Sequence, residues 1–278
     1  MLTLLTVEDK LPVRISERIT ALFRPYRIET EIQNAGDVRL MKMKYFRRRG
    51  EIDFDKIYEI CIGKRKTLLC NKNIIPDDTP FSRFDDREFK CILMDNFICS
   101  VLENADISPS SLRISYYDPR AEYPSLVEKL THFSSIMTVV SDMPRFYENE
   151  AERLAKEYGA SVSVSNDTAD LSPCDILISP AVIKESLPTM QETPVFTVEE
   201  PAAPCRGMII TDYNSALPEE YSALKNEEVN DEYILAALYS LCGKKELGKT
   251  VPFSCSNLTN IFTPDGATRM IKAACEKK

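Results

Sequence analysis

The middle of the chain alternates short apolar runs with longer segments of helical periodicity. Continuous apolar runs at residues 136–140 and 175–179 are typical of strands buried on both faces of a parallel sheet. Four further short runs predict strands at residues 112–117, 161–165, 194–198 and 208–211. Because helical patterns separate the early runs, we expect right-handed βαβ units and an α/β fold with a doubly wound, parallel, six-stranded sheet.

Two apolar stripes predict the helices of this sheet. One joins Tyr123 to Phe133, and the other joins Tyr147 to Tyr158, each with apolar side chains three or four positions apart. Gly159 follows the second stripe at the place where a helix usually ends in a left-handed residue.

The first 108 residues predict a separate α+β domain. A helix is expected at residues 12–23 and another at 85–103. Alternation at residues 41–45 and 52–55, and a hairpin through Gly63 to a strand at 67–70, predict a small antiparallel sheet. Residues 108–111, Ser-Pro-Ser-Ser, are expected to be a linker.

After residue 215 the chain turns helical. Residues 229–242 are apolar nearly all round and are expected to be buried between two domains, and Thr263 with Pro264 predicts the start of a last helix. The expected division is an N-terminal domain at 1–108, a central sheet domain at 109–215, and C-terminal helices at 216–278 that pack back on both.

Composition narrows the classes of function. A net charge of -8 and a pI near 5.0 argue against a nucleic-acid-binding role for the whole chain, because phosphate contacts need a basic face. The chain has no signal peptide pattern and no apolar run long enough for a membrane span, so we expect no membrane partner. Nine cysteines without CxxC spacing and a single histidine, His132, predict a reducing, cytoplasmic protein without a metal site.

Four segments between residues 135 and 180 carry a resemblance to a known family: SIMTVVSD, AERLAKEYGA, SVSVS and PCDILISP. In this order they resemble the second half of the NAD(P)-binding Rossmann-like domain of shikimate dehydrogenases and glutamyl-tRNA reductases. Residues 207–221 are also similar in outline to the last-strand segment of shikimate dehydrogenases. The resemblance implies a dinucleotide site at the carboxyl ends of the strands.

The turn after the first strand departs from that family. Such domains carry G-x-G-x-x-G there, because glycines let the backbone approach the diphosphate. Here the turn after Tyr117 reads Asp118-Pro119-Arg120-Ala121-Glu122, without glycine. We expect Asp118 to cap the following helix and to occupy the amides that a diphosphate would use.

The second strand ends at Asp142, where the resemblance implies an acid that binds the ribose of NAD. The alternative is that Asp142 caps the next helix, and we favour this capping role. Together with Tyr117, Asp118, Ser179 and Pro180, Asp142 is expected to line a small-molecule crevice at the carboxyl ends of the strands. No catalytic residues can be assigned.

Three functional hypotheses follow. The first is a non-catalytic, small-ligand-binding protein, a pseudoenzyme without a cofactor. The second is an NAD(P)-dependent oxidoreductase related to shikimate dehydrogenase, with NAD or NADP held by an altered loop. The third, which the acidic composition disfavours, is a module for nucleic acid or another anionic partner. It rests on a basic cluster of Lys42, Lys44, residues 47–49 and residues 64–66.

Overall fold

The computed structural model describes residues 1–9, 14–61, 67–71, 74–76, 79, 81–257 and 259–276. The chain divides into two compact units, each assembled from two segments. The first unit contains Met1–Asp86 and Ala216–Leu247, and the second contains Arg87–Ser215 and Gly248–Lys278. Within the described ranges, no helix is long and apolar enough to cross a membrane.

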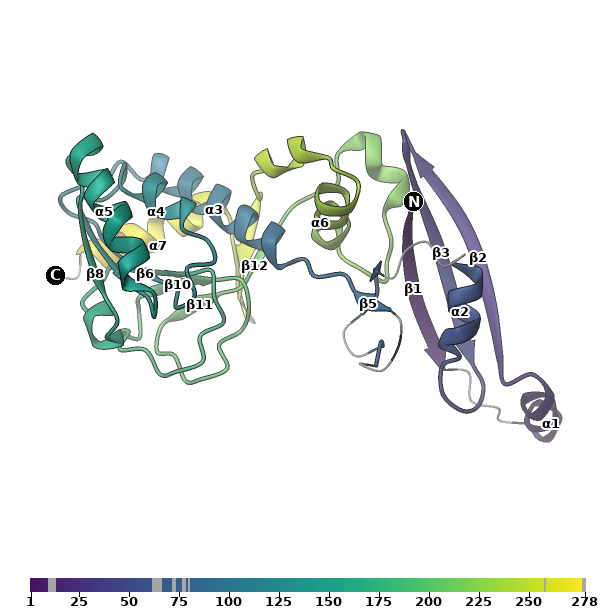
Figure 1. Cartoon of the computed structure of the whole chain (residues 1–278). Helices are drawn as coiled ribbons and strands as arrows, with labels where there is room; N and C mark the ends of the chain where they lie inside the picture. Colours follow the sequence, from purple (N-terminus) through teal and green to yellow (C-terminus); the bar gives the residue numbers. More distant parts are fainter. Residues whose placement is uncertain are drawn as a thin grey trace. The chain divides into compact units, whose positions relative to one another are not determined.

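A six-stranded parallel sheet forms the centre of the second unit (Figure 1). Its order is β11-β10-β9-β6-β7-β8, so the first strand in the chain, β6, lies beside the fourth, β9. This is the 3-2-1-4-5-6 order of Rossmann-like domains. The strands are β6 (Arg113–Tyr117), β7 (Ile136–Val140), β8 (Ser161–Ser165), β9 (Ile176–Ser179), β10 (Pro194–Thr197) and β11 (Met208–Ile210).

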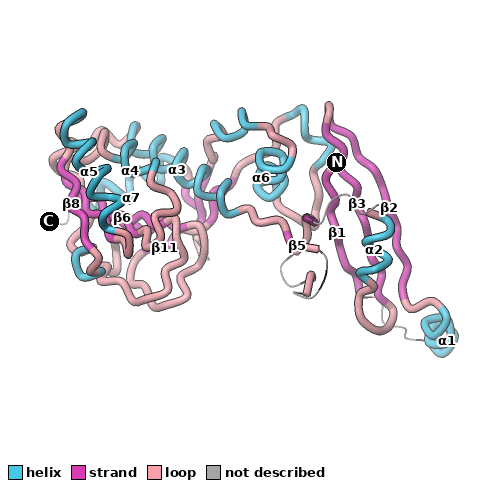
Figure 2. The backbone as a smooth tube through the Cα atoms, in the orientation of Figure 1, coloured by secondary structure: helices cyan, strands magenta, loops and turns pink. Residues whose placement is uncertain are grey.

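Helices connect and cover the strands of this sheet (Figure 2). α4 joins β6 to β7, and α5 joins β7 to β8, as βαβ units require. α3 and α7 pack against each other, and the Thr268 hydroxyl donates to the Val101 carbonyl oxygen at 3.4 Å. The bounds are α3 (Arg87–Glu103), α4 (Ser125–Leu130), α5 (Pro144–Tyr158), α7 (Pro264–Glu276) and the 3₁₀ turns η1 (Thr168–Leu171) and η3 (Lys245–Lys249). A small antiparallel sheet contains β12 (Asp212–Asn214), β13 (Ser254–Ser256) and β14 (Ile261–Phe262).

The α/β prediction for this region is confirmed. All six predicted strands are present, and the observed ends differ from the predicted ones by at most one residue. Gly159 ends α5 with a φ of 70°, which explains why glycine stands there. Thr263 accepts a hydrogen bond from the amide of Gly266, as the N-cap of α7 should.

The first unit contains a mixed sheet rather than the antiparallel sheet predicted for it. β3 (Val38–Arg47) lies in the middle, antiparallel to β2 (Tyr26–Ala35) and parallel to β1 (Leu2–Asp9). β1 and β2 are not among the predicted elements, because β1 is apolar without alternation and β2 is mostly exposed. The remaining elements are α1 (Ile15–Phe23), β4 (Thr67–Leu68), β5 (Ser82–Arg83), the 3₁₀ turn η2 (Glu219–Leu224) and α6 (Asp231–Leu241).

The strand predicted at residues 52–55 is wrong. Helix α2 (Phe54–Ile60) begins there, and Asp53 caps it by accepting the amide of Lys56 at 2.9 Å. Over four residues, the start of a capped helix has the same sequence pattern as an alternating strand. In both cases a polar residue stands next to an apolar one. The predicted turn at Gly63 and the basic residues 64–66 lie outside the described residues.

The contact-based division of the chain also differs from the predicted domains. α3 groups with the parallel sheet, although the sequence analysis assigned it to the first domain. The C-terminal segment is shared, because α6 belongs to the first unit and α7 to the second. In α6, residues 233–238 are all buried within that unit, where the Tyr233 hydroxyl donates to the Phe84 carbonyl oxygen at 3.0 Å.

Candidate functional site: a crevice at the sheet's switch point

A crevice lies at the carboxyl ends of β6, β7 and β9. From β6 the chain crosses to β7 on one side, and from β9 it crosses to β10 on the other, so ligands of open α/β sheets are expected here. The crevice has a volume of about 310 Å³, at the lower end of the range for ligand pockets. Its lining consists of the ends of the strands and three loops: Arg87, Tyr117, Pro119, Arg120, Glu122, Asp142, Ala181, Val182, Lys184 and Glu185.

Asp118 closes the loop that would cradle a diphosphate in a standard Rossmann domain. Its side chain is fully buried, and its two carboxylate oxygens accept the amides of Glu122 and Tyr123, each at 3.0 Å. The Tyr147 hydroxyl donates to the same carboxylate at 2.7 Å. Burial and this carboxylate raise the pKa of Tyr147 far above its ordinary value, so the tyrosine remains a donor.

The remaining backbone of the loop is also unsuited to an anion. Residue 119 is proline and has no amide hydrogen, and the Ala121 amide donates to the Asp118 carbonyl oxygen at 3.2 Å. Ala121 has a φ of 52°, a left-handed conformation that costs an alanine energy. The loop therefore does not fit a diphosphate bound through backbone amides, because its own carboxylate holds them. The expected capping by Asp118 is seen in this loop rather than at the N-terminus of α4, whose N-cap position is Pro124.

Asp142 does not cap α5, contrary to the interpretation that the sequence favoured. The residue before the helix is Met143, and no side-chain hydrogen bond caps it. The Met143 amide is instead bound by the Ser141 hydroxyl at 3.1 Å. Asp142 is exposed, and it lines the crevice at the end of the second strand.

Most of the charged groups in the crevice are already paired. Arg87 forms an ion pair with Glu122 at 2.8 Å, and Arg120 approaches the same carboxylate at 3.9 Å. The Tyr117 hydroxyl donates to Glu185 at 2.7 Å, and burial followed by this bond raises the pKa of Tyr117. Asp142 and Lys184 differ: among the described residues, neither side chain has a hydrogen-bond or ion-pair partner. The crevice thus presents one carboxylate and one ammonium group to a ligand.

Three of the five predicted site residues form the walls behind the crevice. Asp118 is in the closed loop, and the buried Ser179 hydroxyl lies 3.1 Å from the Tyr117 carbonyl oxygen and 2.9 Å from that of Ala181. The Pro180 carbonyl oxygen accepts from Arg87 at 3.4 Å. Only Tyr117 and Asp142 of the predicted set are among the lining residues.

Arg87, Lys184 and Glu185 also line the crevice, although the sequence did not predict them there. Arg87 is the first residue of α3, which the sequence assigned to another domain, and the other two lie in the loop after β9. The available signal was the position of that loop directly after the fourth strand, since loops at the carboxyl ends of such sheets carry ligand contacts.

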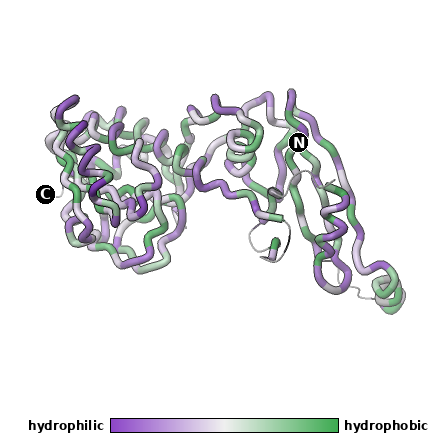
Figure 3. The backbone as a smooth tube through the Cα atoms, in the orientation of Figure 1, coloured by the Kyte–Doolittle hydropathy of each residue, from purple (hydrophilic) through white to green (hydrophobic). Residues whose placement is uncertain are grey.

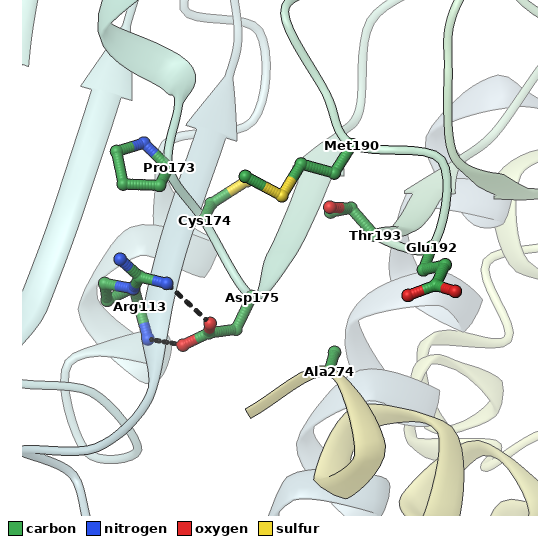
Figure 4. A pocket seen from close by; sticks show the side chains of 8 residues that line it. All are labelled: Arg113, Pro173, Cys174, Asp175, Met190, Glu192, Thr193 and Ala274. Carbon is green, nitrogen blue, oxygen red and sulfur yellow. Dashed lines mark hydrogen bonds and ion pairs between the residues drawn. The ribbon is translucent and has the colours of Figure 1, made fainter. Parts of the chain in front are cut away.

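Two further pockets in the second unit have less suitable linings. One, of about 380 Å³, lies at the amino ends of β6 and β9 (Figure 4). There the Arg113 guanidinium forms an ion pair with the buried Asp175 at 3.1 Å, and burial raises the pKa of the Cys174 thiol to about 11. The other, of about 670 Å³, borders β11 and is mainly apolar. Neither lies where α/β sheets bind ligands, so the smaller crevice at the switch point is the better candidate.

The cysteines and the histidine that the sequence pointed to lie in the core or contact other side chains, and none of them lines the crevice. All nine cysteines are free, and the buried Cys70 packs in the core of the first unit. His132 lies edge-on to Tyr158, with ring centroids 5.5 Å apart. Across the described residues, no group of histidine, cysteine and acidic side chains is arranged to hold a metal ion.

The comparisons with known proteins assign no family to this chain. No family model and no curated protein matches the chain. Solved structures that are similar include Thermococcus litoralis Δ1-pyrroline-2-carboxylate reductase in complex with NADH and L-proline, with 13% identity, a TM-score of 0.31, and 71% of this chain and 68% of that chain covered. L-Tryptophan dehydrogenase from Nostoc punctiforme has 10% identity and a TM-score of 0.33, with 100% and 89% covered. A lysine cyclodeaminase has 14% identity and a TM-score of 0.30, with 94% and 83% covered. At these TM-scores no residue of one chain can be placed on another, so the Rossmann-like assignment rests on the strand order.

Proposed function

We propose that this chain binds a small polar ligand in the switch-point crevice. The observation that carries the proposal is the pair of unpartnered opposite charges, Asp142 and Lys184, in a pocket whose other charges are mostly neutralised by each other. Both side chains are exposed to solvent and have no partner among the described residues, so both are available to a ligand that enters the pocket. Within the described part of the chain, Asp142 and Lys184 form no ion pair that would explain, on structural grounds, why both line one pocket.

The lining indicates the chemistry of the ligand. Lys184 would bind an acidic group, and Asp142 would accept hydrogen bonds from hydroxyl or amino groups. The buried Tyr117 and the apolar Ala181 and Val182 supply the remaining contact surface. A compact molecule that carries an acid at one end and hydrogen-bond donors at the other fits both this charge pattern and the volume of about 310 Å³.

A thermal-shift screen tests this proposal. Amino acids, hydroxy acids, sugar acids and nucleosides are added to the wild-type chain, and a compound that binds only the folded state raises the melting temperature. Lys184→Ala and Asp142→Ala should each abolish the shift. The matched exposed controls Lys156→Ala and Asp265→Ala should leave it unchanged. If no compound class shifts the melting temperature, or if all four variants behave like the wild type, the proposal is wrong.

The second candidate is an NAD(P)-dependent oxidoreductase with an altered phosphate loop. Asp142 favours it, because an exposed acid at the end of the second strand is where such domains bind the adenosine ribose. In that case the diphosphate would contact the side chains of Arg120 and Lys184 in place of loop amides. Reduction or oxidation of a substrate with NADH, NADPH or their oxidised forms would support it, and a thermal shift with none of them would remove it.

The predictions that the protein has no cofactor and no catalytic activity stay predictions. The closed loop argues against one mode of diphosphate binding only. The identity of the bound ligand decides between the small-ligand-binding protein and the oxidoreductase.

A further inference from the structure

Helix α1 in the first unit presents its apolar face to solvent. Ile15, Ile19, Leu22 and Phe23 recur at the spacing of one helix face, and their side chains are 76%, 53%, 60% and 81% exposed. Ala21, which helical geometry places on roughly the opposite side, is only 2% exposed. A surface helix normally turns its apolar stripe towards the core, so this orientation is inverted. Figure 3 shows α1 as a strongly apolar stretch of the backbone.

Arginines gather where this helix ends. Arg24 directly follows Phe23, and the amides of Arg48 and Arg49 both donate to the Pro25 carbonyl oxygen, at 2.8 and 3.1 Å. Among the described residues, none of these three guanidinium groups has an acidic partner. The neighbouring arginines are neutralised, since Arg47 pairs with Asp9 at 2.6 Å and Arg27 pairs with Glu29 at 2.6 Å.

The two described lysines of the basic cluster face acidic residues. Lys42 and Lys44 lie in β3 opposite Glu31 and Glu29 of β2, and such cross-strand pairs of opposite charge balance each other. Among the described residues of the cluster, Arg48 and Arg49 beside the exposed apolar face are therefore the ones that no acidic side chain balances, in a chain with a net charge of -8.

We propose that α1 and these arginines dock this protein on the surface of an anionic phospholipid bilayer. Apolar side chains on one helix face, flanked by arginines, enter the boundary between headgroups and acyl chains while the guanidinium groups bind lipid phosphates. No membrane-spanning helix is needed for such a contact. A second copy of the chain is a poorer occupant, because four such side chains cover roughly 400 Å² and a stable dimer needs about 800 Å² from each partner.

Vesicle co-sedimentation tests the proposal. The full chain is mixed with vesicles of pure phosphatidylcholine, or of equal parts phosphatidylcholine and phosphatidylglycerol. We expect binding to the second kind only, with a loss as the salt concentration rises. Two triple variants, Ile19→Ser with Leu22→Ser and Phe23→Ser, and Arg24→Glu with Arg48→Glu and Arg49→Glu, should each weaken binding by about tenfold or more.

Controls carry changes of the same kind elsewhere on the surface, one apolar-to-serine change and one triple arginine-to-glutamate change. Ile32→Ser removes a side chain of β2 that is 58% exposed, and Arg145→Glu with Arg206→Glu and Arg269→Glu makes the same change of net charge in the second unit. Both should bind like the wild type. Because the substituted side chains of the patch are at the surface, circular dichroism melts should show all variants folded.

Four outcomes would overturn the proposal. The first is absence of binding to the anionic vesicles, and the second is equal weakening by the controls. The third is a dimer in light scattering that the Leu22 and Phe23 changes dissociate, which would make a second copy the occupant. Retention on single-stranded nucleic acid that depends on the arginines and not on the apolar residues would point to a nucleic-acid partner and would also contradict it.

Discussion

At the scale of single residues, Asp118 is the side chain on which the central loop depends. One buried carboxylate satisfies two backbone amides and one tyrosine hydroxyl. A residue in this position plays the part that a bound diphosphate plays in a standard Rossmann domain, because both neutralise the donors of the loop. The loop is thereby complete without a ligand.

Replacing Asp118 should destabilise the fold strongly. Asp118→Ala leaves the buried Tyr147 hydroxyl and two partly buried amides without their acceptor, and we expect the free energy of unfolding to fall by about 3 kcal/mol. Tyr147→Phe removes only one of the three bonds and should cost about 1 kcal/mol. Urea denaturation monitored by circular dichroism measures both. An Asp118→Ala variant as stable as the wild type would mean that the carboxylate does not hold the loop.

Asp118 and Asp142 also show what the sequence could and could not predict about the site. The absence of glycine between Tyr117 and Glu122 was enough to predict that the loop amides are occupied, because the reason is local. The state of Asp142 was not predictable in this way, since no side chain caps α5 and the Met143 amide before the helix is bound by Ser141. Lys184 needed the three-dimensional arrangement, because its loop meets the other strands only through the strand order.

At the scale of elements, strands with both faces buried were the easiest to predict. β7 and β9 are continuous apolar runs, which few other structures produce, whereas β2 has six exposed side chains and only the weaker signal of Tyr26, Ile28 and Ile32 alternating with polar residues. The start of α2 was mistaken for a strand because the deciding interaction is a side-chain cap. Local patterns therefore fail where a single hydrogen bond selects the structure.

The cap of α2 leads to a prediction about that helix. Asp53 accepts the Lys56 amide at 2.9 Å and the Tyr26 hydroxyl at 3.0 Å, so it links the helix to β2. Asp53→Ala should lower the free energy of unfolding by about 2 kcal/mol, the upper end for loss of a cap. Asp55→Ala, in the same turn but without these bonds, should cost no more than about 0.5 kcal/mol. Chemical denaturation of the two variants makes the comparison, and equal losses would show that Asp53 is not the cap.

At the scale of the whole molecule, two compact units are each built from segments distant in the chain. Contact between the α3 segment and α7 in the second unit explains why the predicted boundary at residue 108 does not match the division of the chain. The sequence pattern predicts many of the helices and strands and their order along the chain. It does not predict that the C-terminal helix α7 packs in the unit that begins at Arg87. Such long-range pairings depend on the complete fold.

Buried thiols predict how stability changes with pH. Burial raises the pKa of Cys70 and Cys174 from 9.0 to about 11, and that of Cys91 and Cys255 to about 12. Above pH 9 the unfolded chain releases these protons before the folded chain does, so stability falls as pH rises from about 9 towards 12. Each thiol contributes at most about 1.4 kcal/mol per pH unit. Urea denaturation at a series of pH values should show this decline, with a shallower slope for Cys70→Ala. A constant free energy of unfolding above pH 9 would contradict it.

The most direct test of the account is a calorimetric titration of the full chain with NADH and with NADPH. Because the Asp118 carboxylate holds the amides that a diphosphate would need, we predict no low-micromolar binding of either nucleotide. Low-micromolar binding that is lost in Asp142→Ala but kept in the control Asp265→Ala would contradict the account. That result would assign the crevice to a dinucleotide.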